Sequence, residues 1–426
     1  MIKKPFFGLG KPKLTYLRID EIGRDIKEIP LSGKVTFLLK SPEQGEDLII
    51  SSGDEVRTGQ RLKLYAAGGA CLTSTATGVI TDISTQKGYS GQAFISVTID
   101  AEETDRWDVE FEKTGKRADS ENALRFLSGL PGIIHLTSLI GKENPLSTII
   151  ISGLDQDLLV ATNQLIVRHE AENMAQGIEY LKKITGVSRV IFAVPPYLRP
   201  EAEKSGVEVK VIEPLYPNAI PSLLIKEIMG ITVPASNNRE DLDVGLISAE
   251  GVIALGRAFV EEKMPITKVL TVIDKENRAV GVRARIGTPV HHILESLNIS
   301  VTVGDRLVLG GPMSGRGIYS EEMPIHRDTD AIMVQDKGQV IPASSDPCIN
   351  CGECVRACPA RLPVNMLIRL LENGLYEEAA QEYDLLSCVE CGLCSYVCMM
   401  RIPIFHYIML GKHELASTGA LEESNG

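Results

Sequence analysis

The sequence lacks any apolar run long enough for a membrane-spanning helix. Such a helix needs about 18 consecutive apolar residues. The amino-terminal segment carries Lys3 and Lys4 without a following hydrophobic region of signal-peptide length. We therefore expect a cytoplasmic protein, which would reach the cytoplasmic face of a membrane only through other subunits.

Basic residues are scarce relative to acidic ones. The 426 residues include 44 Lys and Arg against 56 Asp and Glu, which gives a formal charge of -12. Binding to phosphate backbones needs clustered Lys and Arg, so the composition argues against a nucleic-acid surface. Hydrophobic residues make up 44% of the chain, and a chain of this length and composition predicts about three or four domains.

Cysteine is almost confined to one region. Of nine cysteines, only Cys71 lies outside residues 348–398. This distribution argues against a disulfide framework and indicates metal chemistry in a reducing compartment. No histidine or neighbouring base accompanies Cys71, so we interpret it as a small structural residue rather than a redox thiol.

The other eight cysteines form two quartets with the spacing C-x2-C-x2-C-x3-C. Three closely spaced thiolates can bind one face of an iron-sulfur cube, while the fourth points away and completes the neighbouring cube. The two quartets therefore predict two [4Fe-4S] clusters. By this crossed rule, one cluster is held by Cys348, Cys351, Cys354 and Cys398, and the other by Cys388, Cys391, Cys394 and Cys358.

Zinc knuckles and disulfides are the alternative interpretations, because C-x2-C pairs also suit tetrahedral zinc. Zinc sites usually separate two such pairs by a longer stretch. Here three cysteines follow in succession, and Gly352 and Gly392 let the backbone wrap closely. Pro359 follows the first quartet as in ferredoxins, whereas Met399 takes that place after the second quartet and removes no ligand. Iron-sulfur binding is the better interpretation.

Residues 1–110 predict an amino-terminal segment and a small β domain. Short β-rich runs, such as Lys34 to Lys40 and Val79 to Ile83, alternate with turn residues. The pattern looks like the barrel-sandwich hybrid of lipoyl and biotinyl carriers. Those carriers need a lysine at the hairpin tip, but residues 66–69 contain none. We interpret the domain as structural rather than as a carrier.

Residues 111–265 alternate apolar strands with helical stretches. This order predicts a mainly parallel sheet covered by helices. The turn at residues 128–134 separates its two glycines by Leu-Pro and makes a poor phosphate cradle, so we interpret it as an ordinary loop. The predicted strands are Thr148 to Ser152, Ser188 to Val194, Val207 to Ile212 and Asp243 to Ser248, and the predicted helices are Val167 to Ile184, Arg199 to Lys204 and Pro221 to Met229.

Residues 266–340 predict a compact β-grasp-like domain. Its expected elements are strands at Lys268 to Ile273, Val280 to Ile286 and Arg306 to Leu309, and a helix from Pro289 to Leu297. The glycine-rich stretch Gly310 to Gly315 follows the last of these strands. We interpret it as a tight turn, with a cofactor-binding loop as the alternative.

Residues 341–412 hold the cysteine quartets and predict a helical domain, followed by a tail at 413–426. Helices are expected at Val364 to Glu372 and Tyr376 to Leu386, with an apolar face toward the clusters. We expect the acidic residues of these helices to form a solvated face, and the alternative is a docking patch for a basic partner. The acidic residues concerned are Glu372, Glu377, Glu378, Glu382 and Asp384.

In this order of domains and motifs, the chain up to about residue 412 resembles the RnfC family, whose members are subunits of the Rnf electron-transport complex. The matching motifs are Tyr216-Pro217, Arg285 to Val290, Gly310 to Met313, Pro347 to Gly352 and Cys391 to Cys398. The resemblance implies a multidomain α/β fold. Beside the barrel-sandwich hybrid it implies a Rossmann-like domain related to the flavin subunit of respiratory complex I, a soluble-ligand-binding β-grasp (SLBB-like) domain and an α-helical ferredoxin domain.

Four segments depart from the flavin pattern of that family. We therefore expect FMN and NADH binding to be weakened or absent, as suits the relatives that serve cobalamin or proline reduction. The departures are Leu130 to Thr137 in place of a glycine-rich loop, Ser152 to Asp157 in place of an acidic motif, Ala219, Pro221 and Ser222 in place of Gly, Glu and Lys, and Ser248 to Gly251 in place of an asparagine-containing turn.

The sequence thus predicts a subunit that passes single electrons through two clusters to or from a redox partner such as a reductase. Its cysteines are ligands, and we assign no catalytic residue and no further cofactor-binding residue. In the alternative, FMN remains and the chain is an NADH dehydrogenase subunit that feeds the clusters. A structural domain with zinc in the cysteine sites is the third hypothesis.

Overall fold

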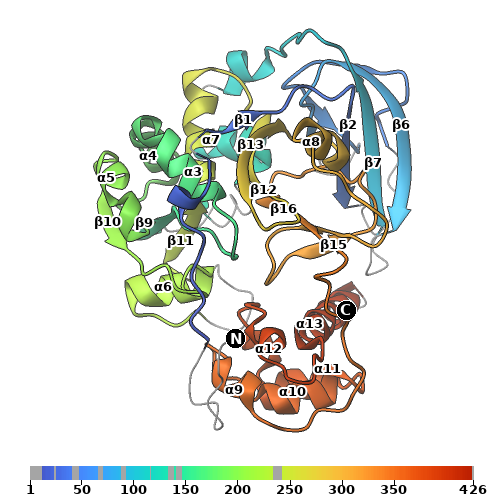
Figure 1. Ribbon diagram of the computed structural model, residues 1–426. Helices are drawn as coiled ribbons and strands as arrows, with labels where there is room; N and C mark the ends of the chain where they lie inside the picture. Colours follow the sequence, from blue (N-terminus) through green and yellow to red (C-terminus); the bar gives the residue numbers. More distant parts are fainter. Residues whose placement is uncertain are drawn as a thin grey trace.

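The computed structural model describes residues 12–23, 25–40, 48–65, 71–87, 93–115, 117–132, 139–140, 146–233 and 242–424. The carrier-type hairpin tip at 66–69 and residues 133–137 of the expected flavin loop lie outside these ranges. Figure 1 shows an α/β domain and a β domain on either side of a central sheet, with a helical domain below them. The chain is a multidomain α/β protein.

The amino-terminal β domain contains an antiparallel sheet with the order β2-β7-β6-β3 and a small sheet of β4 and β5. Inward side chains such as Val35, Ile80 and Val97 are fully buried between the strands. The strand predicted at Lys34 to Lys40 is confirmed. The elements are β2 (Lys34–Lys40), β3 (Glu55–Val56), β4 (Arg61–Lys63), β5 (Cys71–Thr73), β6 (Gly78–Lys87) and β7 (Ala93–Ala101).

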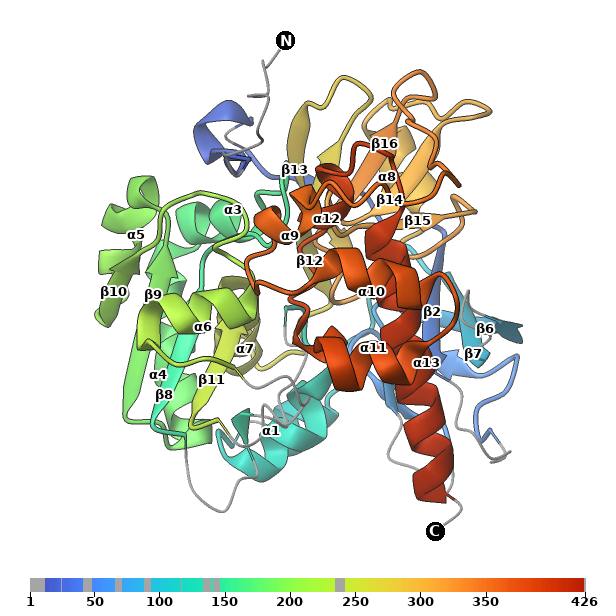
Figure 2. The same cartoon turned by 90° about the horizontal axis from the view of Figure 1, so that it is seen from below.

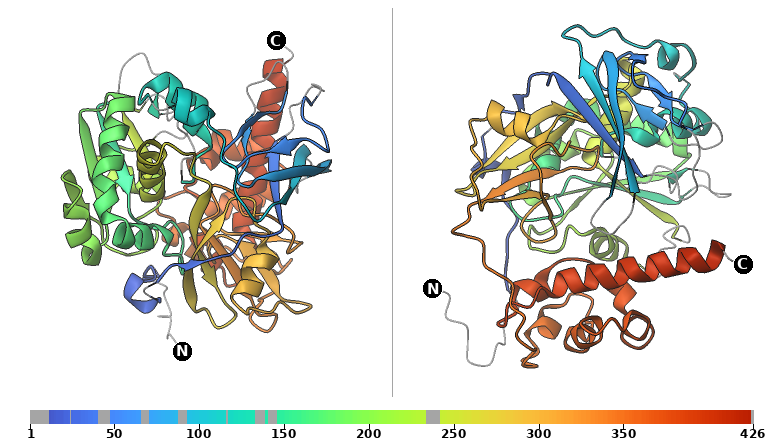
Figure 3. Two further views of the ribbon diagram at one scale, coloured as in Figure 1. Left: turned by 90° about the horizontal axis from the view of Figure 1, so that it is seen from above. Right: turned by 90° about the vertical axis from the view of Figure 1, so that its right-hand side faces the viewer.

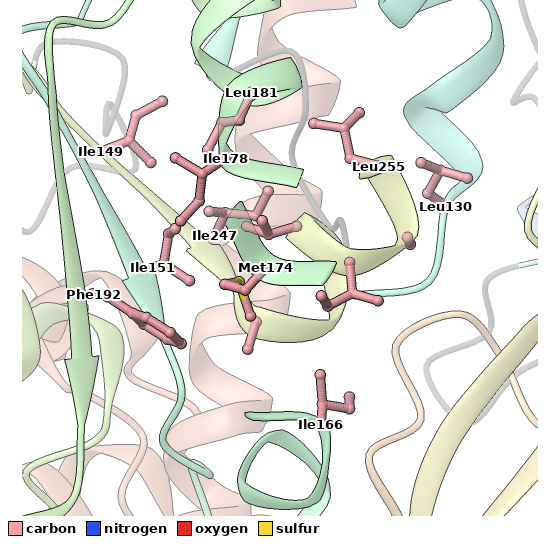
Figure 4. Packing of buried hydrophobic residues seen from close by; sticks show 14 of the residues in the cluster. Leu130, Ile149, Ile151, Ile166, Met174, Ile178, Leu181, Phe192, Ile247 and Leu255 are labelled. Carbon is pink, nitrogen blue, oxygen red and sulfur yellow. The ribbon is translucent and has the colours of Figure 1, made fainter. Parts of the chain in front are cut away.

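The α/β domain contains a parallel sheet with the order β10-β9-β8-β11, which confirms the sequence prediction. Successive residues of a strand point to opposite faces, so Ile149 and Ile151 pack under the helices in Figure 4, whereas Ile150 faces the helical domain. The elements are α1 (Ser120–Phe126), β8 (Thr148–Ser152), α3 (Thr162–His169), α4 (Ala171–Thr185), β9 (Arg189–Val194), α5 (Arg199–Glu203), β10 (Glu208–Val211), α6 (Pro221–Met229), β11 (Val244–Ser248) and α7 (Ala249–Val260).

The single helix predicted at Val167 to Ile184 is wrong, because the chain forms two helices, α3 and α4, that meet at Glu170. The carboxylate of Glu170 accepts hydrogen bonds from the guanidinium groups of Arg257 and Arg283. These ion pairs with distant residues accompany a backbone at Glu170 that is no longer helical. Helical periodicity alone carries no information about such long-range contacts.

Helices α4 and α7 cross at Gly177 and Gly256. A Cβ atom on Gly177 would lie 2.3 Å from the carbonyl oxygen of Val252, and one on Gly256 would lie 2.9 Å from Cα of Gly177. We expect Gly177→Ala to destabilise the protein by about 2 kcal/mol, since overpacking forces the two backbones apart. Chemical unfolding would measure the loss. Gly33→Ala, where nothing lies within 4 Å of the added atom, is the control and should change stability little.

The central domain contains a six-stranded sheet with the order β1-β13-β12-β16-β14-β15. Strand β1 comes from the amino-terminal segment and pairs in parallel with β13. The stretch Gly310 to Gly315 joins the antiparallel strands β14 and β15 as a tight turn, as predicted. The elements are β1 (Lys27–Glu28), β12 (Thr267–Ile273), β13 (Ala279–Arg285), α8 (Val290–Ser296), β14 (Arg306–Leu309), β15 (Arg316–Ile318) and β16 (Ala331–Gln335).

A charged pair joins this domain to the β domain. The guanidinium of Arg285 donates two hydrogen bonds, of 2.8 and 2.7 Å, to the carboxylate of Asp105, and the hydroxyl of Thr58 donates a third of 2.6 Å. The hydrogen bonds from Arg285 are the main reason why the pKa of Asp105 lies below its ordinary value. Bidentate, largely buried pairs of this kind are stronger than surface ion pairs.

A depressed folded-state pKa gives this pair a defined pH dependence. Its stabilisation is complete above the unfolded carboxyl pKa of about 3.9 and is lost as pH falls through the folded value. We expect Asp105→Asn to cost about 2 kcal/mol at pH 6, and the difference from wild type to shrink below pH ~4. Unfolding measured from pH 2.5 to 6 would test this. Glu55→Gln, an exposed position, should show no such trend.

The helical domain covers the other face of the parallel sheet and the edge of the central domain (Figures 1 and 2). The long helix α13 extends beneath the β domain (Figure 3) and continues past residue 412, where the sequence predicted a tail. The five acidic residues expected on a solvated face are all exposed. The elements are α9 (Glu353–Ala357), α10 (Val364–Leu371), α11 (Tyr376–Tyr383), α12 (Leu393–Tyr396) and α13 (Ile404–Ser424).

Candidate metal centre

Four cysteines of the helical domain line one small cavity of about 20 Å³. Met400, Ile402 and Ile404 complete an apolar wall around the sulfur atoms. Three of the cysteines come from the first quartet and the fourth from the end of the second. They are Cys348, Cys351, Cys354 and Cys398, the group that the crossed rule places around one cluster.

The remaining four cysteines also lie near one another. Burial is the main reason why the pKa of the Cys391 thiol is raised to about 12, and the negative charges of Cys388 and Cys358 raise it further. Cys358 likewise adds to the raised pKa of Cys388, where burial again dominates. Such coupling requires short distances. Cys358, from the first quartet, thus lies within electrostatic range of Cys388 and Cys391 of the second.

The two cysteine groups adjoin each other within one hydrophobic core. Cys354 of the first group contributes to the raised pKa of Cys394 in the second, after burial and the nearer Cys388 and Cys391. Cys354, Cys391 and Cys394 are all buried, together with Leu367 and Ile368 of the predicted apolar helix face. A charge on one cysteine group therefore changes the electrostatic potential at the other.

Cys348, Cys351, Cys354 and Cys398 line one cavity between them. Within the ranges that the structure describes, no three His, Cys, Asp or Glu side chains lie close enough to hold a single metal ion. The loops that carry the cysteines turn through left-handed backbone at equivalent places, Asn350 and Gly352 in one and Glu390 and Gly392 in the other. Turns of this kind can present backbone N–H groups to an anion such as cluster sulfide. The donor set and loop shape thus fit an iron-sulfur cubane.

Hydrogen bonds from side chains that are not themselves ligands hold both cysteine loops. In the first loop, the Arg356 guanidinium donates to the carbonyl of Cys351 at 3.0 Å. In the second, the Lys412 ammonium donates to the carbonyl of Cys388 at 2.7 Å and pairs with Glu390 at 2.8 Å. The hydroxyl of Tyr216 donates to the carbonyl of Cys391. The motif Tyr216-Pro217 was visible in the sequence, but its contact with a cysteine 175 residues away was not.

The two groups differ in exposure. Cys351 is exposed, and the neighbouring Ile349 and Met399 keep 56% and 63% of their surface accessible. Cys391 and Cys394 are buried, and Cys388 lines a large interdomain cavity of about 1930 Å³. The first group is therefore the one within reach of another protein.

The segments expected to have lost a flavin site are only partly brought together. Gly129, Gln156, Pro221 and Ser222 line the large cavity, as does Cys71 of β5. Ser248 instead caps α7, where its hydroxyl accepts from the N–H of Gly251 and donates to the carbonyl of Gly132 at 2.9 Å.

The turn at Gly132 packs directly on the first residues of α7. A Cβ on Gly132 would lie 2.6 Å from the backbone nitrogen of Gly251. The first turn of α7 is thus covered by the chain itself.

A buried ion pair near this turn was not foreseen. The ammonium of Lys268, which is fully buried, donates to Glu250 at 2.8 Å and lies 3.5 Å from Asp330. Burial by itself would lower the pKa of Lys268, but the two carboxylates outweigh it and raise that pKa. The lone lysine in the apolar run at 267–273 was the available signal, since buried lysines require a partner.

Residues 341–399 match the 4Fe-4S dicluster domain family. With the eight clustered cysteines, this match identifies an iron-sulfur electron-transport protein with two [4Fe-4S] clusters. The chain is also similar to the C subunit of the ion-translocating oxidoreductase complex of Pectobacterium atrosepticum, with 27% identity over 362 residues. The similarity to the protein of the same name from Pectobacterium carotovorum is 26% over 380 residues. The chain is thus a homologue of these proteins at about 26% identity.

The matches cover 80% and 84% of this chain but only 52% and 51% of those relatives, so the chain spans about half their length. Among solved structures, NAD+-reducing [NiFe]-hydrogenase in the air-oxidized state aligns with a TM-score of 0.46 and 13% identity, over 70% of this chain and 64% of the other. Among the residues described by the structure, no helix has the length and apolar character needed to cross a membrane.

Proposed function

We propose that the chain is an electron-transfer subunit that relays single electrons through its two [4Fe-4S] clusters to or from a partner redox protein, such as a reductase. The observation that carries the proposal is the gathering of eight cysteines into two adjoining groups, one of them open to the surface. Bound clusters supply one-electron chemistry. The protein supplies the thiolates, the apolar surroundings and the hydrogen bonds that hold them.

We propose Cys348, Cys351, Cys354 and Cys398 as the ligands of one cluster. Cys388, Cys391, Cys394 and Cys358 are the proposed ligands of the other. The shared cavity supports the first set, and the contribution of Cys358 to the raised thiol pKa values of Cys388 and Cys391 supports the second. The names of the relatives favour work within an ion-translocating oxidoreductase complex, with any membrane contact made through other subunits.

The partner surface in this proposal surrounds the first cysteine group. Exposed Ile349 and Met399 flank it, and apolar surface next to a cluster is what a transient redox complex covers. Arg361 and Arg401 are exposed on the loops that follow the two quartets. A partner whose own redox site has an acidic rim would be drawn to this end of the molecule.

Metal and spectral analysis test the proposal. Protein purified anaerobically from its native host should contain about eight iron and eight acid-labile sulfide atoms per chain, and it should co-purify with redox subunits. Cluster absorption should bleach on chemical reduction. Zinc in place of iron, or anaerobically prepared protein without sulfide, would overturn the assignment.

A second candidate, FMN-dependent oxidation of NADH, is favoured by the interdomain cavity that reaches Cys388. A flavin there could divide a hydride into two single electrons for the clusters. The covered first turn of α7 supports the preferred proposal, because the N–H of Gly251 already donates to Ser248 and Gly132 packs against it, which leaves little room there for a phosphate. A flavin absorption band that NADH bleaches would favour the second candidate.

A further inference from the structure

The two cysteine loops are equivalent in sequence but are held from different places. Cys351 and Cys391 each occupy the second position of a quartet, and each carbonyl accepts one side-chain hydrogen bond. The donor to Cys351 is Arg356 of the adjacent helix α9, with a half-exposed side chain. The donor to Cys391 is Tyr216, which belongs to the α/β domain. The Cys351 carbonyl is therefore held from within its own domain and the Cys391 carbonyl from outside it.

Tyr216 is firmly seated where it meets the second loop. Its side chain keeps only 5% of its surface exposed, and its ring lies 5.5 Å from that of Tyr16. Its backbone N–H donates to the carbonyl of Leu14 at 2.8 Å. These contacts fix the ring, so its hydroxyl presents a fixed donor to the cysteine loop.

The glycine-rich turn of the central domain holds the same loop from another side. Asp157 accepts hydrogen bonds from the backbone of Met313 and from both the backbone and hydroxyl of Ser314, at 3.0, 2.7 and 2.7 Å. A Cβ on Gly311 would lie 2.5 Å from the carboxyl carbon of Asp157. The turn is thus pressed onto the α/β domain.

The carbonyl of Met313 in turn lies against Gly392. A Cβ on Gly392 would lie 2.3 Å from that oxygen, so only glycine fits there. The Cys391-Gly392 peptide is therefore enclosed between Tyr216 on one side and Met313 on the other. Both contacts come from outside the helical domain.

We propose that Tyr216 is a positioning residue that fixes the Cys391 carbonyl and thereby raises the reduction potential of the second cluster, as Arg356 does independently for the first. The inference rests on the ligand sets of the proposed function. A hydrogen bond to a carbonyl of the ligand loop draws electron density away from that peptide and favours the reduced state, which carries one more negative charge. Removing the donor makes the potential more negative.

The test is a redox titration of the full chain, purified anaerobically and followed by electron paramagnetic resonance. Tyr216→Phe keeps the ring and removes the hydroxyl, and Arg356→Gln removes the guanidinium. We expect both variants to keep the iron and sulfide content of the wild type. Each variant should make the midpoint potential of one cluster more negative, and the affected cluster should differ between the two variants. Tyr396→Phe, with an exposed side chain in the same domain, is the matched control and should move neither.

The outcomes separate this inference from the proposed function. Wild-type protein without iron and sulfide removes the proposed function and the inference with it. If both clusters are present and their midpoint potentials stay unchanged in Tyr216→Phe, the inference alone is overturned. It is also overturned if both variants shift the potential of the same cluster. If Tyr216→Phe does not yield folded protein, Lys412→Gln replaces it, because Lys412 holds the other end of the same loop. That variant must then shift the midpoint potential of the cluster whose potential Arg356→Gln leaves unchanged.

Discussion

Replacing Cys358 by alanine is expected to remove the cluster of the second quartet and to leave the cluster of its own quartet in place. The proposed crossed ligand sets require this result, because they assign Cys358 to the cluster of Cys388, Cys391 and Cys394. The single variant should keep about half of the iron. Iron and sulfide analysis, with the amplitude of the cluster signals in electron paramagnetic resonance, would measure it.

Double variants make this test decisive. The losses of iron caused by two substitutions add up when the residues serve separate clusters, but not when they serve the same cluster. Adding Cys391→Ala to Cys358→Ala should cause no further loss of iron, and adding Cys351→Ala should remove the remainder. The reverse pattern would show that each cluster follows its own quartet. Cys71→Ala, outside the helical domain, is the control and should keep the full content of both clusters.

The largest expected effect on stability comes from Lys268→Met. The change removes a fully buried cation and leaves the carboxylate of Glu250 buried without its partner. Breaking a buried ion pair on one side costs about 3 to 5 kcal/mol. Chemical unfolding of the variant should show a loss in this range, and thermal unfolding a correspondingly lower midpoint.

The double variant Lys268→Met with Glu250→Gln shows whether the loss comes from the unpaired charge. Glutamine keeps an oxygen for the backbone N–H of Val269, which donates to Glu250 at 2.9 Å. We expect the double variant to regain a substantial part of the stability that the single variant loses. Equal loss in both would point to packing instead. Lys204→Met, at an exposed position, should change stability by less than about 0.5 kcal/mol.

Local signals in the sequence predicted much of the fold. The strand at Thr148 to Ser152 was predicted with its observed bounds, because a run buried on both faces is continuously apolar. The helix at Pro221 to Met229 was also predicted correctly, since proline begins it and Gly230 ends it with a left-handed residue. Cysteine spacing is also a local signal, and it predicted the two clusters because the ligands of one cluster face lie close together in the chain.

What the sequence did not predict depends on long-range contacts. The break at Glu170 comes with Arg257 and Arg283, and β1 pairs with a strand about 250 residues later. Tyr216, which donates to the second cysteine loop, also comes from a distant segment. Neither propensity nor periodicity reports such pairings. The Tyr216-Pro217 and Gly310 to Met313 motifs were recognised as matching segments, but only the structure brings them to Gly392 and Cys391.

The hydrophobic core beneath the parallel sheet has a consequence for how the protein matures. This core joins residues of the sheet and α6 to the buried sulfur ligands of the helical domain. Iron and sulfide insertion would therefore complete the contact surface between two domains, and a group bound only by the docked form stabilises docking by mass action. In protein without clusters we therefore expect the carboxyl-terminal domain to be less firmly docked and more readily cut by protease than in the loaded protein.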